Sequence, residues 1–434
     1  MKVVCDISLL GIFLYGKKCG LFRTAENFIM ALKESKECDL TFCSSLSFET
    51  WAKSLNYTMQ NQLGQDIFFI GQNQREKTRK RAYDSLFNLK RYAGSKGWCR
   101  TEFLPDFVPN FLGYKFDLIS PKDLDSQNIF HSLYHRLPSI SKLKKNINNF
   151  LTVHDIIPIM YPHLCGIDEK LSNFDKNFNL KQSLDSLNKE SWIICISNST
   201  RNDLCNFLEN KIDPQKIFVI SWGAAADIFY PCSNLEKFNS IKIKYNLPSA
   251  PYILSLSPLD TRKNLNHLIQ CFLDLIEQEK IKDLYLVLAG DIPSYSSYDS
   301  IFKAVSSYPH LKERIIFTGY VDDQDLASLY SNALVFVYPS LYEGFGLPPL
   351  EAMQCGTPVI TSNTSSLPEI VGNAGIMLDP HDVDGLCESL FKLYQQTSLQ
   401  NILSLQSINQ AQKFSWSKCI QETIAAYQYS LSQS

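Results

Sequence analysis

Residues 340–361, SLYEGFGLPPLEAMQCGTPVIT, decide how the rest of the chain is interpreted. Directly before them lies Ala333–Pro339, an apolar segment rich in β-branched and aromatic residues that predicts a buried strand. Pro348 and Pro349 mark a helix start, because proline needs no N–H group in a first turn and its fixed φ suits helix entry. The predicted order is therefore strand, glycine loop, helix.

This glycine loop predicts an anion-binding site. Gly344 and Gly346 leave the backbone bare enough for a ligand to approach its amides, and the helix start adds unpaired N–H groups. Glu343 and Glu351 flank the loop, where carboxylates can accept hydrogen bonds from sugar hydroxyls on either side of a bound phosphate. We expect Glu351 in the first helical turn. The alternative to ligand binding is that Glu351 only complements the helix dipole.

Length and composition indicate a soluble protein of two domains. The 434 residues exceed the roughly 250–300 at which one core stops growing. A composition of 45% hydrophobic and 20% charged residues is ordinary for a globular protein, and a net charge of -2 gives no general reason to expect nucleic-acid binding. The 13 cysteines form no CxxC pair, which favours reduced thiols and the cytoplasm. The N-terminus does not resemble a signal peptide, and no uncharged run approaches the ~18–20 apolar residues of a membrane span.

The first half alternates strand and helix patterns, which predicts a parallel doubly wound sheet. The expected strands cover 3–10, 39–43, 128–133, 149–153, 190–197 and 216–223. A loop with Gly11, Gly16 and Gly20 follows the first strand and precedes a helix, as in a phosphate-approach loop or in ordinary turn chemistry. His154 and Asp155 end a strand, where an α/β sheet places its ligands, although a structural histidine is the alternative.

The second half restarts the pattern after a linker-like stretch at 224–248. Arg262 and Lys263 lie between an expected strand at 252–257 and a helix at 265–275, where they could neutralise a diphosphate or simply be solvated. Further strands are expected at 284–290 and 314–320, and helices at 386–394 and 416–427. The segment Asp322–Asp325 resembles a DxD metal motif, but its position before a helix favours capping over metal binding.

A basic stretch at 75–100 carries nine Lys and Arg residues against two acids, with aromatic and leucine residues between them. A basic amphipathic helix on an otherwise neutral protein can dock on anionic lipid headgroups. The alternative is a solvated helix face over an apolar contact.

Together these residues resemble the family 4 glycosyltransferases, retaining enzymes of the GT-B fold. The signature is Glu-x7-Glu, here Glu343 to Glu351, accompanied by Arg262-Lys263-Asn264, the Gly319-Tyr-Val-Asp turn and Leu367-Pro-Glu-Ile370. In the first half, Gly20-Leu-Phe-Arg23 and the His154-Asp155 pair also match. Residues from about 43 to 125 do not match, and there such families vary their acceptor contacts.

The resemblance implies two Rossmann-like domains that face one another across a cleft. The first, 1–230, would bind the acceptor, and the second, 231–412, would bind the nucleotide-sugar. A helix at 413–434 would cross back to the first domain.

The resemblance also assigns site residues. Arg262 and Lys263 would hold the diphosphate and offset charge on the departing nucleotide, so that no metal is required. Glu351 would bind the ribose hydroxyls, and Glu343 would bind the transferred sugar. The donor-binding loop would also include Gly344, Phe345, Gly346 and Leu347. Gly20 would let the backbone of the first domain approach the phosphate, and His154 would contact the sugar near the reacting carbon.

The expected activity is retaining transfer of a hexose from a nucleotide-sugar to a glycan or lipid-linked acceptor in cell-surface polysaccharide synthesis. GDP-mannose is the favoured donor, through likeness to bacterial mannosyltransferases. A UDP-hexose-dependent transferase of the same fold and a non-catalytic nucleotide-sugar-binding protein are the alternatives. Retention would follow from front-face attack, with Asp155 as a candidate helper, and no cofactor beyond the co-substrate is expected.

Overall fold

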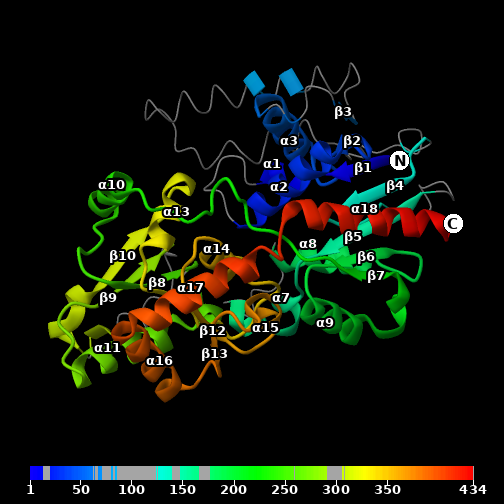
Figure 1. Ribbon diagram of the computed structural model, residues 1–434. Helices are drawn as coiled ribbons and strands as arrows, with labels where there is room; N and C mark the ends of the chain where they lie inside the picture. The colour runs from blue at the N-terminus through cyan, green and yellow to red at the C-terminus, as the bar shows by residue number, and fades with distance from the viewer. Residues whose placement is uncertain are drawn as a thin grey trace.

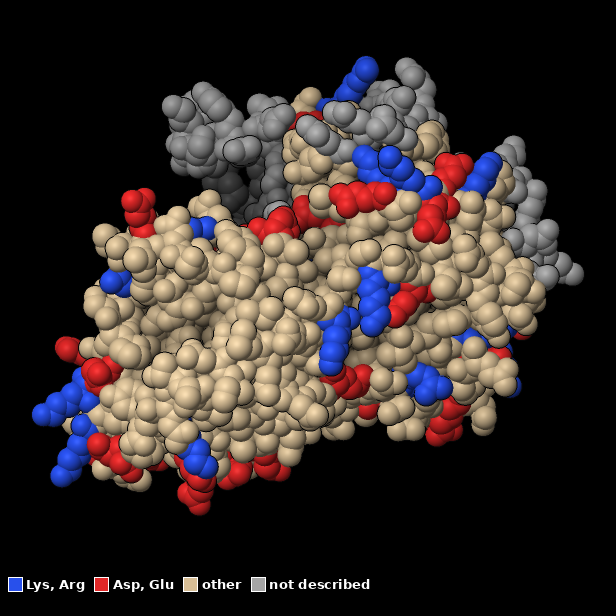
Figure 2. Space-filling model, viewed as in Figure 1, with Lys and Arg blue, Asp and Glu red and all other residues tan. Residues whose placement is uncertain are grey.

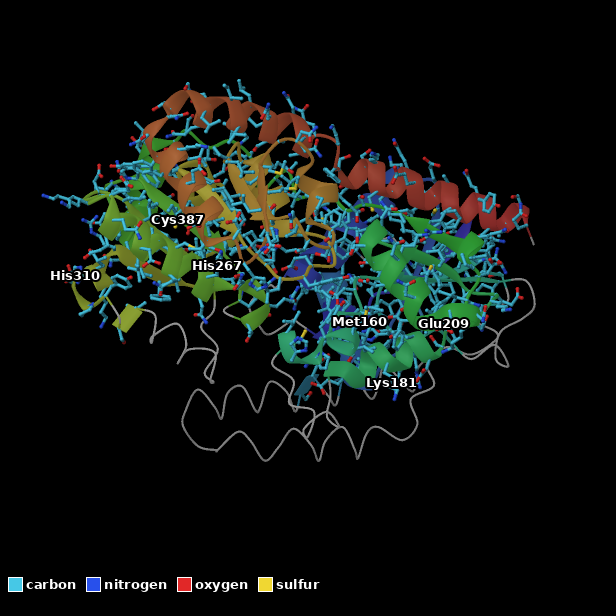
Figure 3. All side chains as sticks on the ribbon, turned by 90° about the horizontal axis from the view of Figure 1, so that it is seen from below. Met160, Lys181, Glu209, His267, His310 and Cys387 are labelled. Carbon is cyan, nitrogen blue, oxygen red and sulfur yellow. The ribbon has the colours of Figure 1, made fainter. Side chains whose placement is uncertain are left out.

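The computed structural model describes residues 1–12, 20–61, 63, 67–70, 80–81, 84–85, 124, 126–138, 147–165, 176–258, 260–290, 305–306 and 308–433. Gly16, most of the basic stretch 75–100 and much of the variable region 43–125 lie outside these residues. The described part forms two α/β halves, which lie side by side in Figure 1. Figure 3 shows the same arrangement from below, with Met160, Lys181 and Glu209 on the first half and His267, His310 and Cys387 on the second.

The first half contains a sheet in the order β3-β2-β1-β4-β5-β6-β7, and every pairing is parallel. Its strands are β1 Lys2–Asp6, β2 Asp39–Cys43, β3 Phe68–Phe69, β4 Ile129–Ser132, β5 Asn148–Val153, β6 Trp192–Cys195 and β7 Ile217–Val219. Its helices are α1 Ser8–Ile12, α2 Gly20–Ser35, α3 Phe48–Gln60, α7 Ile157–Met160, α8 Lys176–Asp185 and α9 Asn198–Leu208. Short 3-10 turns are η2 Pro162–Cys165, η3 Glu209–Lys211 and η4 Pro214–Lys216.

The first strand is shorter than its apolar run predicts. It ends at Asp6, whose Oδ1 accepts hydrogen bonds from the backbone N and the Oγ of Ser8 at 2.9 and 2.6 Å. These bonds turn the chain into α1, so the apolar residues Leu9 and Leu10 pack from a helix instead of a strand.

The second half contains a parallel sheet in the order β10-β9-β8-β11-β12-β13. Its strands are β8 Tyr252–Leu256, β9 Tyr285–Ala289, β10 Ile315–Gly319, β11 Val335–Tyr338, β12 Val359–Ser362 and β13 Ile376–Leu378. Its helices are α10 Leu235–Tyr245, α11 Leu265–Gln278, α13 Asp323–Ser331, α14 Leu347–Gln354, α15 Leu367–Val371, α16 Val383–Gln395 and α17 Thr397–Ala411, with 3-10 turns η5 Thr261–Lys263 and η6 Pro309–Arg314. This is the Rossmann strand order 3-2-1-4-5-6, which places ligands where the order reverses, between β8 and β11.

The linker-like stretch is partly helical, which corrects its sequence-based interpretation. Asn234 caps α10 by accepting from the N–H of Lys237, and Asn246 ends the helix in the left-handed conformation at φ 53°. Few apolar residues of α10 face the core, Ile241 and Tyr245 among them, so the hydrophobic periodicity is weak.

The last helix, α18 Trp416–Ser432, crosses back and packs on α2, as expected for a GT-B fold. Tyr427 is fully buried, and its hydroxyl lies 2.5 Å from Nδ1 of His131 on β4. The first half is therefore built from both ends of the described chain.

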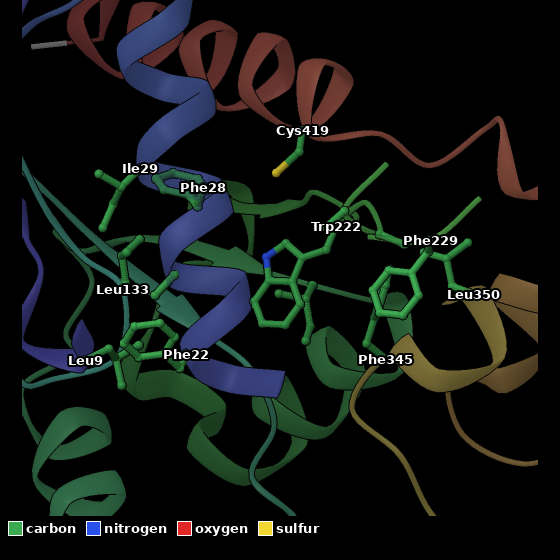
Figure 4. Close-up of a cluster of buried hydrophobic side chains, with 14 of the residues drawn as sticks. Leu9, Phe22, Phe28, Ile29, Leu133, Trp222, Phe229, Phe345, Leu350 and Cys419 are labelled. Atoms are coloured by element: carbon green, nitrogen blue, oxygen red, sulfur yellow. The ribbon is translucent and has the colours of Figure 1, made fainter. Parts of the chain in front are cut away.

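One hydrophobic cluster joins the two halves, and Figure 4 shows part of it. Trp222 lies between α2 and Phe345, with ring centroids of Trp222 and Phe345 5.9 Å apart. Cys419 of α18 is part of the same cluster and points toward it in Figure 4. Within the described residues, no helix is long and apolar enough to cross a bilayer.

Candidate active site

Adjacent strands bring together the two segments that were predicted to form the donor site. Turn η5, with Arg262 and Lys263, follows β8, and the loop with Glu343 follows β11. Strands β8 and β11 are parallel neighbours, so their carboxyl ends meet at the same edge of the sheet. Residues 80 positions apart therefore come into direct contact.

The contact is a buried cluster of two cations and one carboxylate. Lys263 Nζ lies 2.6 Å from Glu343 Oε1, and Arg262 Nη1 lies 2.8 Å from Glu343 Oε2. Ser340 Oγ donates to the same Oε1 at 2.6 Å, and Lys263 Nζ also reaches the hydroxyl of Tyr338 at 2.5 Å. A second carboxylate lies at the edge of the cluster, with Asp260 Oδ2 4.0 Å from Arg262 Nη2.

The environment of the cluster shifts the pKa values of its members. Burial alone would raise the pKa of Glu343, but the charges of Lys263 and Arg262 outweigh burial and lower that pKa to about 2. Burial lowers the pKa of Lys263, against the opposing pull of Glu343. Glu343 is therefore ionised at neutral pH and acts as the counter-ion of two groups that can hold a phosphate.

Unused donors surround this cluster. Arg262 Nε is buried and has no hydrogen-bond partner among the described residues. The backbone amides of Gly344, Phe345 and Gly346 likewise donate to no described group. Gly346 adopts φ 117°, a conformation open to glycine, and leads into α14. The predicted loop thus presents free N–H groups beside a cluster that contains two cations, as an anion site requires.

Glu351 lies deeper in α14 than predicted. The helix begins at Leu347, before the two prolines, which places Glu351 in the second turn. Its side chain is buried (5% exposed), and Oε2 accepts from the hydroxyl of Tyr330 at 3.0 Å. The other oxygen has no partner among the described residues and remains available to a ligand. Burial raises the pKa of Glu351, and the charge of Arg23 opposes that rise.

Arg23, on α2 of the first half, extends toward the second half. Its guanidinium lies 5.6 Å from the ring centroid of Phe229, and Nη1 is 3.5 Å from Asp323. Nε and Nη1 are buried without a hydrogen-bond partner. Burial would lower the pKa of Arg23, but the charge of Glu351 raises it. Arg23 is therefore a largely buried cation that contacts Asp323 and Phe229 and whose Nε makes no hydrogen bond to a described residue.

His154 and Asp155 face the donor loop from the first half. His154 Nε2 donates to the carbonyl of Leu133 at 2.5 Å, and its buried Nδ1 has no partner among the described residues. Burial lowers the pKa of His154 to about 4, so the ring is neutral at pH 7 with Nδ1 as a free acceptor. A Cβ built on Gly344 would come within 2.5 Å of the His154 carbonyl and 2.7 Å of Asp155 Cβ. The His154–Asp155 segment of the first half and the donor-binding loop of the second half are therefore in close contact at Gly344.

Gly20 is the first residue of α2 and approaches the same place. Among the described residues, a Cβ on Gly20 would meet only Leu347 Cδ1, at 3.9 Å. These residues therefore leave space beside the glycine, as approach by a phosphate or sugar would require.

The acidic segment at the start of α13 forms ion pairs with basic side chains of the protein itself. Asp322 and Asp325 lie 2.6 and 2.7 Å from Lys244 Nζ. Asp322 is the N-cap residue of α13, but its side chain makes no capping hydrogen bond, so that detail of the prediction is wrong. Among the described residues, no cluster of His, Cys, Asp and Glu has the geometry to hold a metal ion.

Several contributors were not predicted from the sequence. Ser340, Tyr338 and Tyr330 orient the charged groups, and they lie in segments that the pattern assigned only to a strand, a loop or a helix. Arg23 stands within a matching motif, but its pattern gave no hint that it pairs with Asp323 of the second half. Only the three-dimensional arrangement shows these contacts.

Two Rossmann-like halves with a charged cluster at their junction and a crossover helix are typical of the GT-B class of transferases. The family described as Glycosyl transferases group 1 matches residues 237–411. O-antigen chain mannosyltransferase B of Escherichia coli is 34% identical over 300 residues, which cover 69% of this chain and 74% of that protein. The chain belongs to the group 1 glycosyl transferases. It is accordingly an enzyme, a retaining hexosyltransferase.

Other similar proteins differ in length or only share the fold. The serotype-specific mannosyltransferase WbdA of Escherichia coli is 32% identical over 263 residues, and the chain spans 31% of its length. Sucrose-phosphate synthase from Thermosynechococcus elongatus superimposes with a TM-score of 0.63 at 18% identity, covering 100% of this chain and 99% of that one. WaaG, a glycosyltransferase involved in lipopolysaccharide biosynthesis, gives 0.59 at 12% identity, covering 98% of each chain. Both structures confirm the GT-B architecture.

Proposed function

We propose that the protein transfers mannose from GDP-mannose to a glycan or lipid-linked acceptor in the synthesis of a cell-surface polysaccharide. The choice of sugar is supported by the similarity to O-antigen chain mannosyltransferase B and to WbdA. The choice of reaction rests on one observation, the buried Arg262–Lys263–Glu343 cluster with free N–H groups beside it.

The cluster is suited to a nucleoside diphosphate as the leaving group. Negative charge grows on the diphosphate as its bond to the sugar breaks, and fixed cations in a water-poor site stabilise that charge without reorganising. Arg262 Nε and the amides of the 344–346 loop are donors beside the cluster that have no partner among the described residues. Arg262 and Lys263 would therefore hold the diphosphate.

The two acids of the signature would bind different parts of the donor. Glu351 has a free oxygen next to Tyr330 and would accept from the ribose hydroxyls. Glu343 would bind the sugar and set the positions of both cations. His154 offers a free Nδ1 acceptor and would contact a sugar hydroxyl near the reacting carbon. Gly20 would leave room for the phosphate.

Retention follows from attack on the same face as departure. The acceptor hydroxyl oxygen forms its bond to the anomeric carbon as the bond from that carbon to the phosphate oxygen breaks. The hydroxyl proton passes to the departing phosphate, which leaves as nucleoside diphosphate. Asp155, which lies against Gly344, is a candidate helper for this proton.

A donor screen by thermal shift tests the donor. A ligand that binds only the folded protein stabilises it by about 2.7 kcal/mol at 100 times its Kd. We expect GDP-mannose to raise Tm more than GDP, UDP-glucose or UDP-N-acetylglucosamine, and Arg262→Ala to abolish the shift. Radiolabelled mannose should then appear in a mannose-terminated acceptor. A larger shift and faster transfer with a UDP-hexose would replace the proposed donor, and binding without transfer or donor hydrolysis would contradict turnover.

The membrane-facing part of this proposal concerns the basic stretch 75–100. Of its basic residues, the structure describes Lys80, which is bonded to Asp84 and Asn56 at 2.7 and 2.5 Å, and the exposed Arg81. On the face shown in Figure 2, the described acidic and basic side chains are interspersed. We propose that the stretch docks on anionic lipid at the cytoplasmic surface. Liposome flotation tests it, since equal recovery with anionic and neutral vesicles would contradict docking.

A further inference from the structure

Helix α9 of the first half docks its N-terminus on a carboxylate of the second half. Glu369 on α15 accepts from the backbone N of Asn198 at 2.8 Å, from Asn198 Nδ2 at 2.9 Å and from the backbone N of Ser199 at 2.8 Å. The partners are 170 or more positions apart in sequence. Two of the three donors are backbone groups, so a side-chain change on α9 cannot remove them.

These amides have no local substitute. The first N–H groups of a helix lack intrahelical partners, and a nearby carboxylate also gains from the helix dipole. The capping residue, Ser197, uses its Oγ to accept from the N–H of Thr200. The backbone N–H groups of Asn198 and Ser199 therefore find their hydrogen-bond acceptor in Glu369, across the junction of the two halves.

The same turn of α9 holds the donor loop. Ser197 Oγ donates to the carbonyl of Gly344 at 2.7 Å, and Thr200 Oγ1 lies 3.1 Å from that carbonyl. In a trans peptide the C=O and the following N–H point in opposite directions. Fixing the Gly344 carbonyl therefore fixes the Phe345 N–H, one of the unused amides beside the cation cluster.

We propose that Glu369 is a positioning residue of the transfer reaction. It holds α9 against the second half, and α9 in turn aims the Phe345 amide at the donor. A second link supports this, because the Tyr342 hydroxyl lies 2.9 Å from both carboxylate oxygens of Asp203 on α9. The inference rests on the proposed function for its catalytic consequence, while the coupling from α9 to the loop stands on geometry.

The test compares Glu369→Gln with Asn198→Ala and with a control, Glu388→Gln, whose carboxylate pairs with Lys392 away from the junction. In Glu369→Gln an NH2 group replaces one acceptor and faces an N–H donor. We expect kcat to fall about tenfold, with the Kd for GDP within about twofold of wild type. Asn198→Ala loses one side-chain donor only, so kcat should fall less than threefold, and the control should match wild type.

Hydrogen–deuterium exchange provides a readout that needs no substrate. Glu369→Gln should speed exchange both at the start of α9 and in the 343–347 loop, at an unchanged Tm. Faster exchange in α9 alone, or equal kcat losses for Glu369→Gln and Asn198→Ala, would overturn the proposal. If the wild type transfers no sugar from any donor, the proposed function fails, but exchange in the loop still decides the coupling.

Discussion

At the scale of single residues, Glu343 has ion-pair partners that the sequence did not predict. The resemblance assigned it to the sugar and assigned Arg262 and Lys263 to the phosphate, but the structure bonds all three together. A buried carboxylate between two cations competes with any anion that needs those cations. The diphosphate of a donor must therefore compete with Glu343 for Arg262 and Lys263.

Glu343→Gln should tighten product binding while slowing transfer. Without the Glu343 carboxylate, Lys263 loses its ion-pair partner and Arg262 keeps only Asp260, at 4.0 Å. We therefore expect the Kd for GDP to fall about fivefold, or by about 1 kcal/mol. We expect kcat to fall about 10²-fold, because sugar binding and cation placement are both lost. Isothermal titration and initial rates measure these effects. Glu351→Gln is the contrast, since it should weaken GDP binding, and weakening in both variants would contradict the counter-ion role.

His131 should make the first half sensitive to acid. Its ring is buried between the Tyr427 hydroxyl and Thr152 Oγ1, and burial lowers its pKa to about 3. Between pH 6.5 and 3 the unfolded chain therefore binds the proton and the folded chain does not, so stability falls as pH falls. From pH 7 to 5 this loss is about 2 kcal/mol.

His131→Gln should flatten this dependence. Its Tm will be lower than that of the wild type at pH 7, but we expect the difference to shrink toward pH 5 by about 4–8 °C. Calorimetric scans at both pH values measure it. An equal Tm decrease with pH in both proteins would show that His131 does not titrate on unfolding.

The donor loop is the critical element, and Gly344 is its tightest point. An added methyl group would meet the carbonyl of His154 at 2.5 Å. Gly344→Ala must therefore push the loop away from the first half. Since a displacement of about 1 Å can cost 10²-fold in rate, we expect kcat to fall about 10²-fold. A rate within threefold of wild type would show that the loop accommodates the methyl group.

Gly20→Ala should behave differently, because the described residues leave space beside Gly20. Alanine also favours the helix by up to about 1 kcal/mol, so Tm should stay the same or rise. If a phosphate passes there, donor KM should rise about tenfold. An unchanged KM would place the phosphate elsewhere.

Elements with a strong pattern were predictable and those with a weak one were not. The buried strands β2, β8 and β11 lie within two residues of their expected bounds, since β-branched runs ended by Pro or polar residues leave few alternatives. Helix α17 was missed, because its buried face consists of Leu403, Ser407 and Ala411, a weak apolar stripe.

The donor site was predictable as a set of residues but not as a set of contacts. The resemblance named both acids and both cations, yet the bonds between them depend on β8 lying beside β11. Pairing of strands 80 residues apart has no signal in local periodicity. The docking of α9 on Glu369 was missed for the same reason.

At the scale of the whole molecule, α18 belongs to the half that contains the start of the described chain. Ile420, Ile424 and Tyr427 are buried against that half. Burial of such side chains contributes about 1.5–3 kcal/mol each, so removing residues 415–434 should destabilise the first half by about 5 kcal/mol or more. Separate calorimetric transitions should show a lower Tm for the first half and a nearly unchanged one for the second. Tyr427→Phe, a matched point variant, should cost only about 1 kcal/mol.

The return of α18 also sets an order on biosynthesis. Strands β1 to β7 leave the ribosome first, but the part of α2 that packs on α18 stays uncovered until residues 416–432 have been made. The second half needs only residues up to 411 for its sheet and helices, so it can complete its fold earlier. The half translated first is thus the last to be finished, and until then its exposed apolar surface is open to chaperones or to misassembly.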